Sequence, residues 1–368
     1  MAQPNQSVAT RSGYYPVLDA LRFLLAFWVV VGHDHMIPLF GDPALGVGYW
    51  RLFKHAWSTL VFGTPAVIVF FVISGFCIHL PFRGSSRIDV WRYYLRRYTR
   101  ILIPVAAAIL SFRLMGSHLV FRGKDSILFN SPLWSLACEE IYYALYPLLR
   151  WIRNAVGWGR MLPASFVVGI SIAATHPHFD GWQIFGPFGT AMILLPVWLL
   201  GCYLAEQAEK LGEADRRHSI WFWRFLAWFG CWSAEMLHFK LHIHYTQTMV
   251  WFGVLAYFWI REEIAYGKTH APNKILVAAG SWSYSLYLMH WHGGTIFVAL
   301  GLDNLNLGGI SKWLALISVS LLLSYVFYLL VERPSHKLAR KIKVRGTPKV
   351  AEPIAGPARV PAASYPSQ

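Results

Sequence analysis

The amino-acid sequence predicts an all-α, polytopic integral membrane bundle with about ten transmembrane helices and both termini in the cytoplasm. The 368-residue chain is 56% hydrophobic and only 14% charged, whereas about 25% of the residues in a soluble domain are charged. Its mean hydropathy is +0.41. Several apolar runs approach or exceed the roughly 20 residues that cross a bilayer. The 18 tryptophans also suit a chain with many membrane–water interfaces.

Ten apolar segments are the candidate spans. They lie near residues 17–38, 57–80, 101–118, 134–152, 161–176, 184–206, 219–237, 243–261, 274–300 and 310–331. If the N-terminus is cytoplasmic, the cytoplasmic segments hold 25 Lys and Arg residues and the outer segments hold seven. Basic residues concentrate in the cytoplasmic loops of membrane proteins, so this asymmetry supports ten spans with both termini inside.

The chain divides into three regions. Residues 1–16 form a polar cytoplasmic segment, residues 17–341 form one transmembrane domain, and residues 342–368 form a Pro- and Ala-rich cytoplasmic tail predicted to be disordered. A net charge of +15 would suggest a nucleic-acid partner in a soluble protein. Here we interpret it as loop charge beside a lipid bilayer and expect no nucleic-acid partner. The four cysteines show no disulfide or metal-ligand spacing, so no metal site is expected.

The first span contains two ionisable residues, Arg22 and His33, among apolar neighbours. Their separation of eleven residues is close to three helical turns, which points both side chains the same way about 16 Å apart along the axis. Ala26 and Val29 lie between them on this face and predict a shallow groove. Ionisable groups within a membrane are costly and usually serve a function, so this face is a candidate site.

Six ordered segments, of which the first carries an Arg-x10-His pattern, resemble the membrane-bound acyltransferase-3 family over about residues 15–341. They are LDALRFLLAFWVVVGH (18–33), FFVISGFCI (70–78), RRYTRILIP (96–104), SPLWSLACEEIYYALYPLL (131–149), SYSLYLMHW (283–291) and YLLVERP (328–334). The resemblance implies an acyl-CoA-dependent O-acyltransferase that modifies sugars or envelope glycans. It also implies a multi-pass protein of the bacterial cytoplasmic (inner) membrane.

The resemblance also implies roles for individual residues. His33 would act as the catalytic base or acyl carrier, and Glu139 would orient it or raise its basicity. A group of arginines would bind the phosphates of acyl-CoA, namely Arg22, Arg97 and Arg100. A possible acceptor pocket would comprise Trp134, Ser135, Tyr287 and His290.

Each of these residues has a structural alternative. His33 could form a hydrogen bond across helices, and Arg22 could pair with Asp19 three residues earlier on the same helix face. The two arginines near residue 100 could be ordinary cytoplasmic loop charge. Glu139 could form an interhelical hydrogen bond at the outer rim.

The expected reaction is transfer of an acyl group, with acetyl as the expected group, from acyl-CoA to a carbohydrate hydroxyl at or across the membrane. Acetyl-CoA would be the donor substrate, and no permanently bound cofactor is expected. The acceptor could instead be an antibiotic or a lipo-oligosaccharide. An alternative from another class is a proton-coupled transporter or flippase, which also places His, Glu and Arg in the membrane. That alternative predicts paired broken helices in two related halves, a pattern that the sequence does not show.

Overall fold

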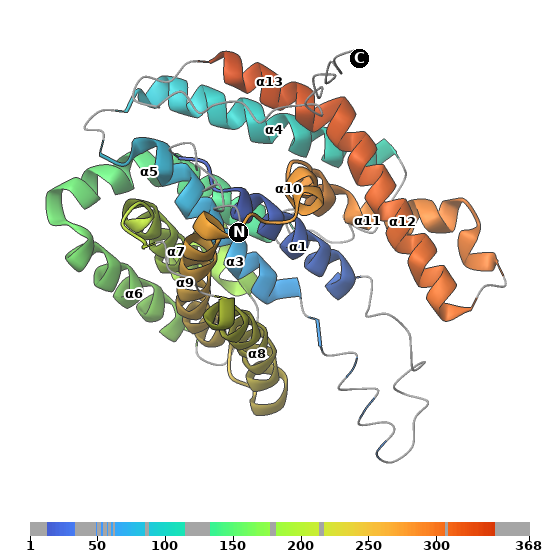
Figure 1. Ribbon diagram of the computed structural model, residues 1–368, viewed down its shortest axis with the longest axis horizontal. Coiled ribbons are helices and arrows are strands. Elements are labelled where there is room, and N and C mark those ends of the chain that lie inside the picture. Colours follow the sequence, from blue (N-terminus) through green and yellow to red (C-terminus); the bar gives the residue numbers. More distant parts are fainter. Residues whose placement is uncertain are drawn as a thin grey trace, which may run out of the picture.

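The computed structural model describes residues 13–33, 60–61, 63–84, 88–114, 133–176, 182–212, 217–305 and 308–342, together with the single positions Tyr49, Phe53 and Trp57. All regular secondary structure in these ranges is helical, which confirms the predicted all-α class. Figure 1 shows the helices gathered into one bundle, in which α3 and α7 lie near the centre. Most of residues 1–16 and nearly all of the predicted tail 342–368 lie outside the described ranges.

Among the described residues, four helical segments are long and apolar enough to cross a membrane. They are α1 (Pro16–His33), α3 with its 3-10 extension (Gly63–Phe82), α7 (Gly186–Gln207) and the continuous segment from α12 through α13 (Gly309–Lys341). The other long helices are α4 (Val90–Leu114), α5 (Trp134–Val156), α6 (Trp158–Ala174), α8 (Arg217–Leu241) and α9 (Tyr245–Thr269). These helices overlap the remaining predicted spans, while the number of ten spans and the side of each terminus stay predictions.

The predicted ninth span, residues 274–300, is not one continuous helix. It consists of α10 (Lys274–Gly280) and α11 (Ser283–Ala299), separated by a turn at Ser281 and Trp282. The turn is stabilised locally, because the Ser283 hydroxyl donates to the Gly280 carbonyl over 2.9 Å. A Cβ atom at Gly280 would lie 2.1 Å from the Asp19 carbonyl oxygen. The short helix α10 therefore packs directly against the first turn of α1, which a straight span would not allow.

Helices α3 and α7 approach closely through two glycines at their crossing. A Cβ atom at Gly75 would lie 2.0 Å from the Trp198 carbonyl oxygen, and one at Gly201 would lie 2.0 Å from the Val72 carbonyl oxygen. The backbones of α3 and α7 are therefore in direct contact at both glycines. Small residues commonly permit such close packing in membranes, where water provides no hydrophobic driving force between helices.

The last helix changes direction through a π-helical turn. Helix α12 (Gly309–Phe327) continues into a π turn (Tyr328–Glu332) and then into α13 (Arg333–Lys341). Helix α13 packs along α4, as Figure 1 shows at the top of the bundle. The predicted tenth span, 310–331, thus ends within the π turn, and the basic helix α13 follows it.

We predict that Gly201→Ala destabilises the protein, because even one methyl group must push the α3 backbone away from α7. The expected loss is about 1–3 kcal/mol of unfolding free energy. It would be measured as a lower thermal unfolding temperature of detergent-solubilised protein. The matched control is Gly294→Ala in α11, where a Cβ atom meets nothing within 4 Å. Equal stability of the two variants would contradict the close packing of α3 and α7.

Candidate active site

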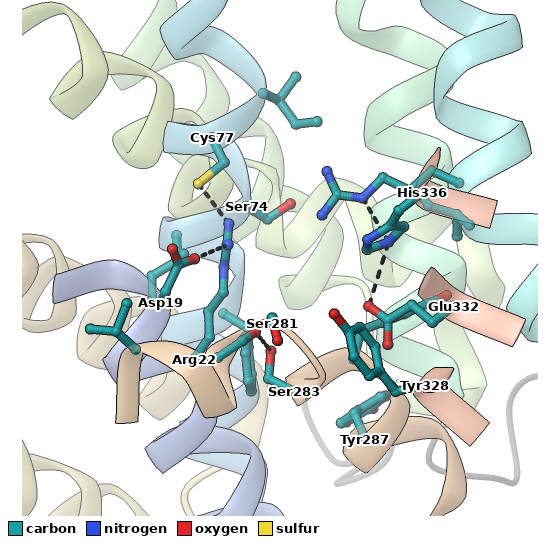
Figure 2. A pocket seen from close by; sticks show the side chains of 18 of the residues that line it. Asp19, Arg22, Ser74, Cys77, Ser281, Ser283, Tyr287, Tyr328, Glu332 and His336 are labelled. Atoms are coloured by element: carbon teal, nitrogen blue, oxygen red, sulfur yellow. Dashed lines mark hydrogen bonds and ion pairs between the residues drawn. The ribbon is translucent and has the colours of Figure 1, made fainter. Parts of the chain in front are cut away.

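A large cavity opens among helices that are far apart in the sequence. Its volume is about 1350 Å³, and its walls come from α1, α3, α4, α5, α10, α11, the π turn and α13. Pockets for drug-sized molecules usually have volumes of about 300–1000 Å³. This cavity is therefore suited to a larger ligand. Figure 2 shows side chains from several of these helices pointing towards the same space.

The walls of the cavity carry a strong excess of positive charge. Eight Lys or Arg side chains line it, against three carboxylates. The basic residues are Arg22, Arg97, Arg100, Lys274, Arg333, Lys337, Arg340 and Lys341. Such a surface favours an anion, and arginine in particular can hold phosphate through two parallel hydrogen bonds.

Arg22 extends from α1 into this cavity, as predicted for a ligand-binding arginine. Its Nη1 donates to Asp19 Oδ1 over 2.9 Å, and its Nη2 donates to the Cys77 sulfur over 2.7 Å. The Asp19 pair considered as a structural alternative is therefore present as well. Asp19 holds the guanidinium group in place, while Arg22 still forms part of the cavity wall (Figure 2).

The two predicted arginines of α4, Arg97 and Arg100, line the same cavity as Arg22 and contact different partners. The Arg97 guanidinium lies 5.1 Å from the centre of the Tyr143 ring, a separation at which a cation is attracted to the aromatic face. Arg100 Nε donates to His336 Nε2 over 3.0 Å. His336 in turn lies 3.4 Å from Glu332, which couples α4 to the π turn and α13. The structure thus brings all three predicted arginines to one cavity.

Glu139 lies in the same cavity, next to Ser74 and Tyr143 rather than next to His33. The Ser74 and Tyr143 hydroxyls are 2.9 Å apart, and both lie beside the Glu139 carboxyl group. The positive charges of Arg97 and Arg22 also act on this carboxyl group. The described contacts of His33 do not include Glu139. The predicted role of Glu139 in orienting His33 is therefore not reflected in this arrangement.

Two of the four predicted acceptor-pocket residues form a hydrogen-bonded pair inside the cavity. The hydroxyls of Ser135 and Tyr287 are 2.7 Å apart, and both residues line the wall. Trp134 is not part of the wall, and its ring packs edge-on against Phe71 with centres 6.3 Å apart. Ser135 and Tyr287 therefore mark the part of the cavity nearest to the remaining predicted residue, His290.

His33 and His290 form a stacked pair just beyond the cavity wall. Their ring centres are 5.1 Å apart, and the Tyr287 ring lies 6.1 Å from His290. His33 Nδ1 lies 3.0 Å from the Val29 carbonyl oxygen, and His290 Nδ1 lies 2.8 Å from the Tyr287 carbonyl oxygen. Carbonyl oxygens only accept, so each Nδ1 carries the hydrogen and each Nε2 of a neutral ring keeps its lone pair. Within the described residues, His290 Nε2 has no hydrogen-bond partner.

The groove expected along Ala26 and Val29 is filled in this structure. Both residues are fully buried, and Ala26 packs with Val30, Leu286 and Ile317. Helix α11 therefore covers the face between Arg22 and His33. The prediction that the two side chains share one open groove was wrong, because neighbouring helices fill the space beside small residues.

Several residues of the cavity were missed by the sequence analysis. The missed residues include the uncharged Ser74 and Tyr143 and the acidic Glu332. None of them belongs to a sequence pattern with a recognisable spacing. The basic residues of α13 were counted only as cytoplasmic loop charge. Their spacing at positions 333, 337, 340 and 341 places them on one face of a helix, and this signal was available in the sequence.

Comparisons with known proteins identify the family to which this chain belongs. A family model described as an acyltransferase domain matches residues 15–329. The chain therefore belongs to the acyltransferase-3 family of membrane proteins. A similar curated protein is "Acyltransferase MdmB" of Streptomyces mycarofaciens, which is 23% identical over 396 aligned positions covering 88% of this chain and 92% of the relative. No solved structure gives a significant match.

We predict that a small thiol reagent such as N-ethylmaleimide modifies Cys77 before the other cysteines. Cys77 lines the open cavity, whereas Cys138 and Cys202 are at most 1% exposed. Mass spectrometry of briefly treated protein should find the adduct on Cys77, and Cys77→Ser should remove the fast phase of labelling. Faster modification of Cys138 or Cys202 would show that the cavity is not open as described.

Proposed function

We propose that this protein transfers an acetyl group from acetyl-CoA to a hydroxyl group of a carbohydrate acceptor, in a bacterial inner membrane. Membership of the acyltransferase family supports the reaction class. The donor, the acyl group and the acceptor are inferred from the chemistry of the cavity and from the family resemblance. A lipid-linked or envelope glycan is the acceptor that suits a membrane-embedded site.

The observation that carries the proposal is the basic cavity of about 1350 Å³, whose lining residue Tyr287 lies beside the His33–His290 pair. Coenzyme A is a long ligand with phosphate groups at one end and a thiol at the other. Phosphates bound by Arg22, Arg97 and Arg100 would leave the pantetheine arm free to extend towards Ser135 and Tyr287. The thioester would then approach the His33–His290 pair, as the proposed step requires.

The histidine tautomers support a base role for this pair. Because Val29 holds the Nδ1 hydrogen of His33, the basic Nε2 atom is available to accept a proton. In the proposed step, Nε2 takes the proton of the acceptor hydroxyl while its oxygen attacks the thioester carbonyl. The C–S bond then breaks, and the coenzyme A thiolate leaves and becomes protonated. In the second possible route, His33 Nε2 first carries the acetyl group and then passes it to the acceptor.

We predict that His33→Ala lowers acetyl-CoA turnover at least 100-fold, because general-base catalysis contributes about 10²–10⁴-fold. The assay uses full-length protein in nanodiscs with radiolabelled acetyl-CoA and follows both coenzyme A release and label on the protein. Label retained on the wild type and absent from His33→Ala would favour the acyl-enzyme route. If the wild type consumes neither acetyl-CoA nor other acyl-CoAs, the proposal fails and a transporter becomes the better hypothesis.

We also predict that Arg22→Gln raises KM for acetyl-CoA about 10–100-fold, with a smaller effect on kcat. The loss of one hydrogen bond to a charged phosphate costs about 1.5–3 kcal/mol, and each 1.4 kcal/mol corresponds to a tenfold change. The matched control is Arg92→Gln on α4, because Arg92 pairs with Asp89 and does not line the cavity. Its KM should stay within about twofold of the wild type. A similar rise in both variants would argue against a specific phosphate contact.

A further inference from the structure

The C-terminal helix α13 presents a basic face to the cavity. Arg333, Lys337, Arg340 and Lys341 follow the spacing i, i+4, i+7, i+8, which places four cations on one side of the helix. All four side chains are exposed and line the cavity. The opposite side of α13 is fixed, because Ser335 and Ala339 are buried. The basic face therefore belongs to the cavity rather than to the packing of the helix.

The position of α13 is fixed by contacts through the π turn. Glu332, which is 1% exposed, accepts hydrogen bonds from the backbone nitrogen and the hydroxyl of Ser285 in α11. The Ser335 hydroxyl donates to the Glu332 carbonyl over 2.8 Å. His336 accepts from Arg100 of α4. The helix is thus attached to both α4 and α11, and its four cations occupy a defined wall.

Within the described residues, no acidic partner neutralises the charge of this wall. Helix α13 contains no acidic residue. Of the three carboxylates that line the cavity, Asp19 pairs with Arg22 and Glu332 contacts Ser285 and His336, while Glu139 lies beside Ser74 and Tyr143. In the part of the chain that the structure describes, no ion pair involves the four cations of α13. A ligand with its own negative charge is the natural counterpart.

We propose that the basic face of α13 is a second anion subsite, which binds a terminal phosphomonoester of the donor. Figure 2 shows His336 and Glu332 on the other side of the cavity from Arg22 and Cys77, so α13 and the π turn meet this space opposite α1 and α3. In the proposed function, Arg22, Arg97 and Arg100 take the pyrophosphate. The α13 face then takes the 3′-phosphate of coenzyme A, a group that carries nearly two negative charges at neutral pH. This inference rests on the proposed acyl-CoA donor and adds the feature of the donor that α13 recognises.

The test compares binding of coenzyme A and 3′-dephospho-coenzyme A, two ligands that differ only in this phosphate. Dissociation constants are measured by isothermal titration calorimetry for full-length protein in nanodiscs. The wild type should bind coenzyme A about 10–100-fold more tightly, as expected for one charged group held by charge-assisted hydrogen bonds. The Lys337→Gln/Arg340→Gln double variant should lose this preference to within about threefold while binding 3′-dephospho-coenzyme A as the wild type does.

The control variant and the alternative outcomes make the test decisive. Arg92→Gln should keep the full preference of the wild type, because Arg92 lies outside the cavity. Unchanged binding of 3′-dephospho-coenzyme A by the double variant also shows that the protein is folded. Equal weakening of both ligands, or a wild type without preference, would overturn the subsite but leave the donor proposal intact. A double variant that keeps the full preference for coenzyme A would likewise overturn the subsite. A wild type that binds neither ligand would reject the donor proposal and the subsite together.

Discussion

The positive charge of Arg22 inside an apolar helix bundle is the constraint on which the site depends. A cation at such a position is costly unless the protein supplies partners or access to water. Here the partners are Asp19 on the same helix and Cys77 on α3, and the cavity provides the access. Asp19 also touches α10 through its backbone, because Gly280 has no side chain. The half-buried Arg22 side chain thus links α1 to α3 at the edge of the cavity, while α10 packs against the backbone of its partner Asp19.

The two histidines illustrate how the orientation of a side chain can be fixed locally. The sequence analysis assigned the orienting role to Glu139 because a carboxylate commonly fixes a histidine tautomer. In the structure, a backbone carbonyl one turn earlier does this for both His33 and His290. A backbone acceptor needs no particular residue type, so no motif can reveal it. Glu139 remains in the cavity with two hydroxyl neighbours, Ser74 and Tyr143.

Features that depend on the local sequence could be predicted, whereas features that depend on contacts between residues far apart in the chain could not. Helix positions were predictable because long apolar runs have few alternatives in a membrane. The convergence of Arg22, Arg97 and Arg100 with Ser135 and Tyr287 was implied by ordered family segments. The division between α10 and α11 was not predictable, because it depends on contact between Gly280 and a residue about 260 positions away. The filled face at Ala26 and Val29 has the same cause, since small residues equally suit an open groove and a tightly packed neighbour.

The π turn between α12 and α13 has a consequence for how the C-terminal helix tolerates genetic change. A π turn contains one residue more than the α-helical turn that it replaces. Five residues in the wider π turn rotate the chain about as far as four residues of an α-helix do. Removing one residue there would therefore restore a regular helix and leave the four cations of α13 facing the cavity. The same deletion in the regular part of α12 would rotate everything after it by about 100°, although composition, charge and hydropathy would hardly change. The π turn is therefore a place in this segment at which loss of a single codon preserves the angular phase of α13.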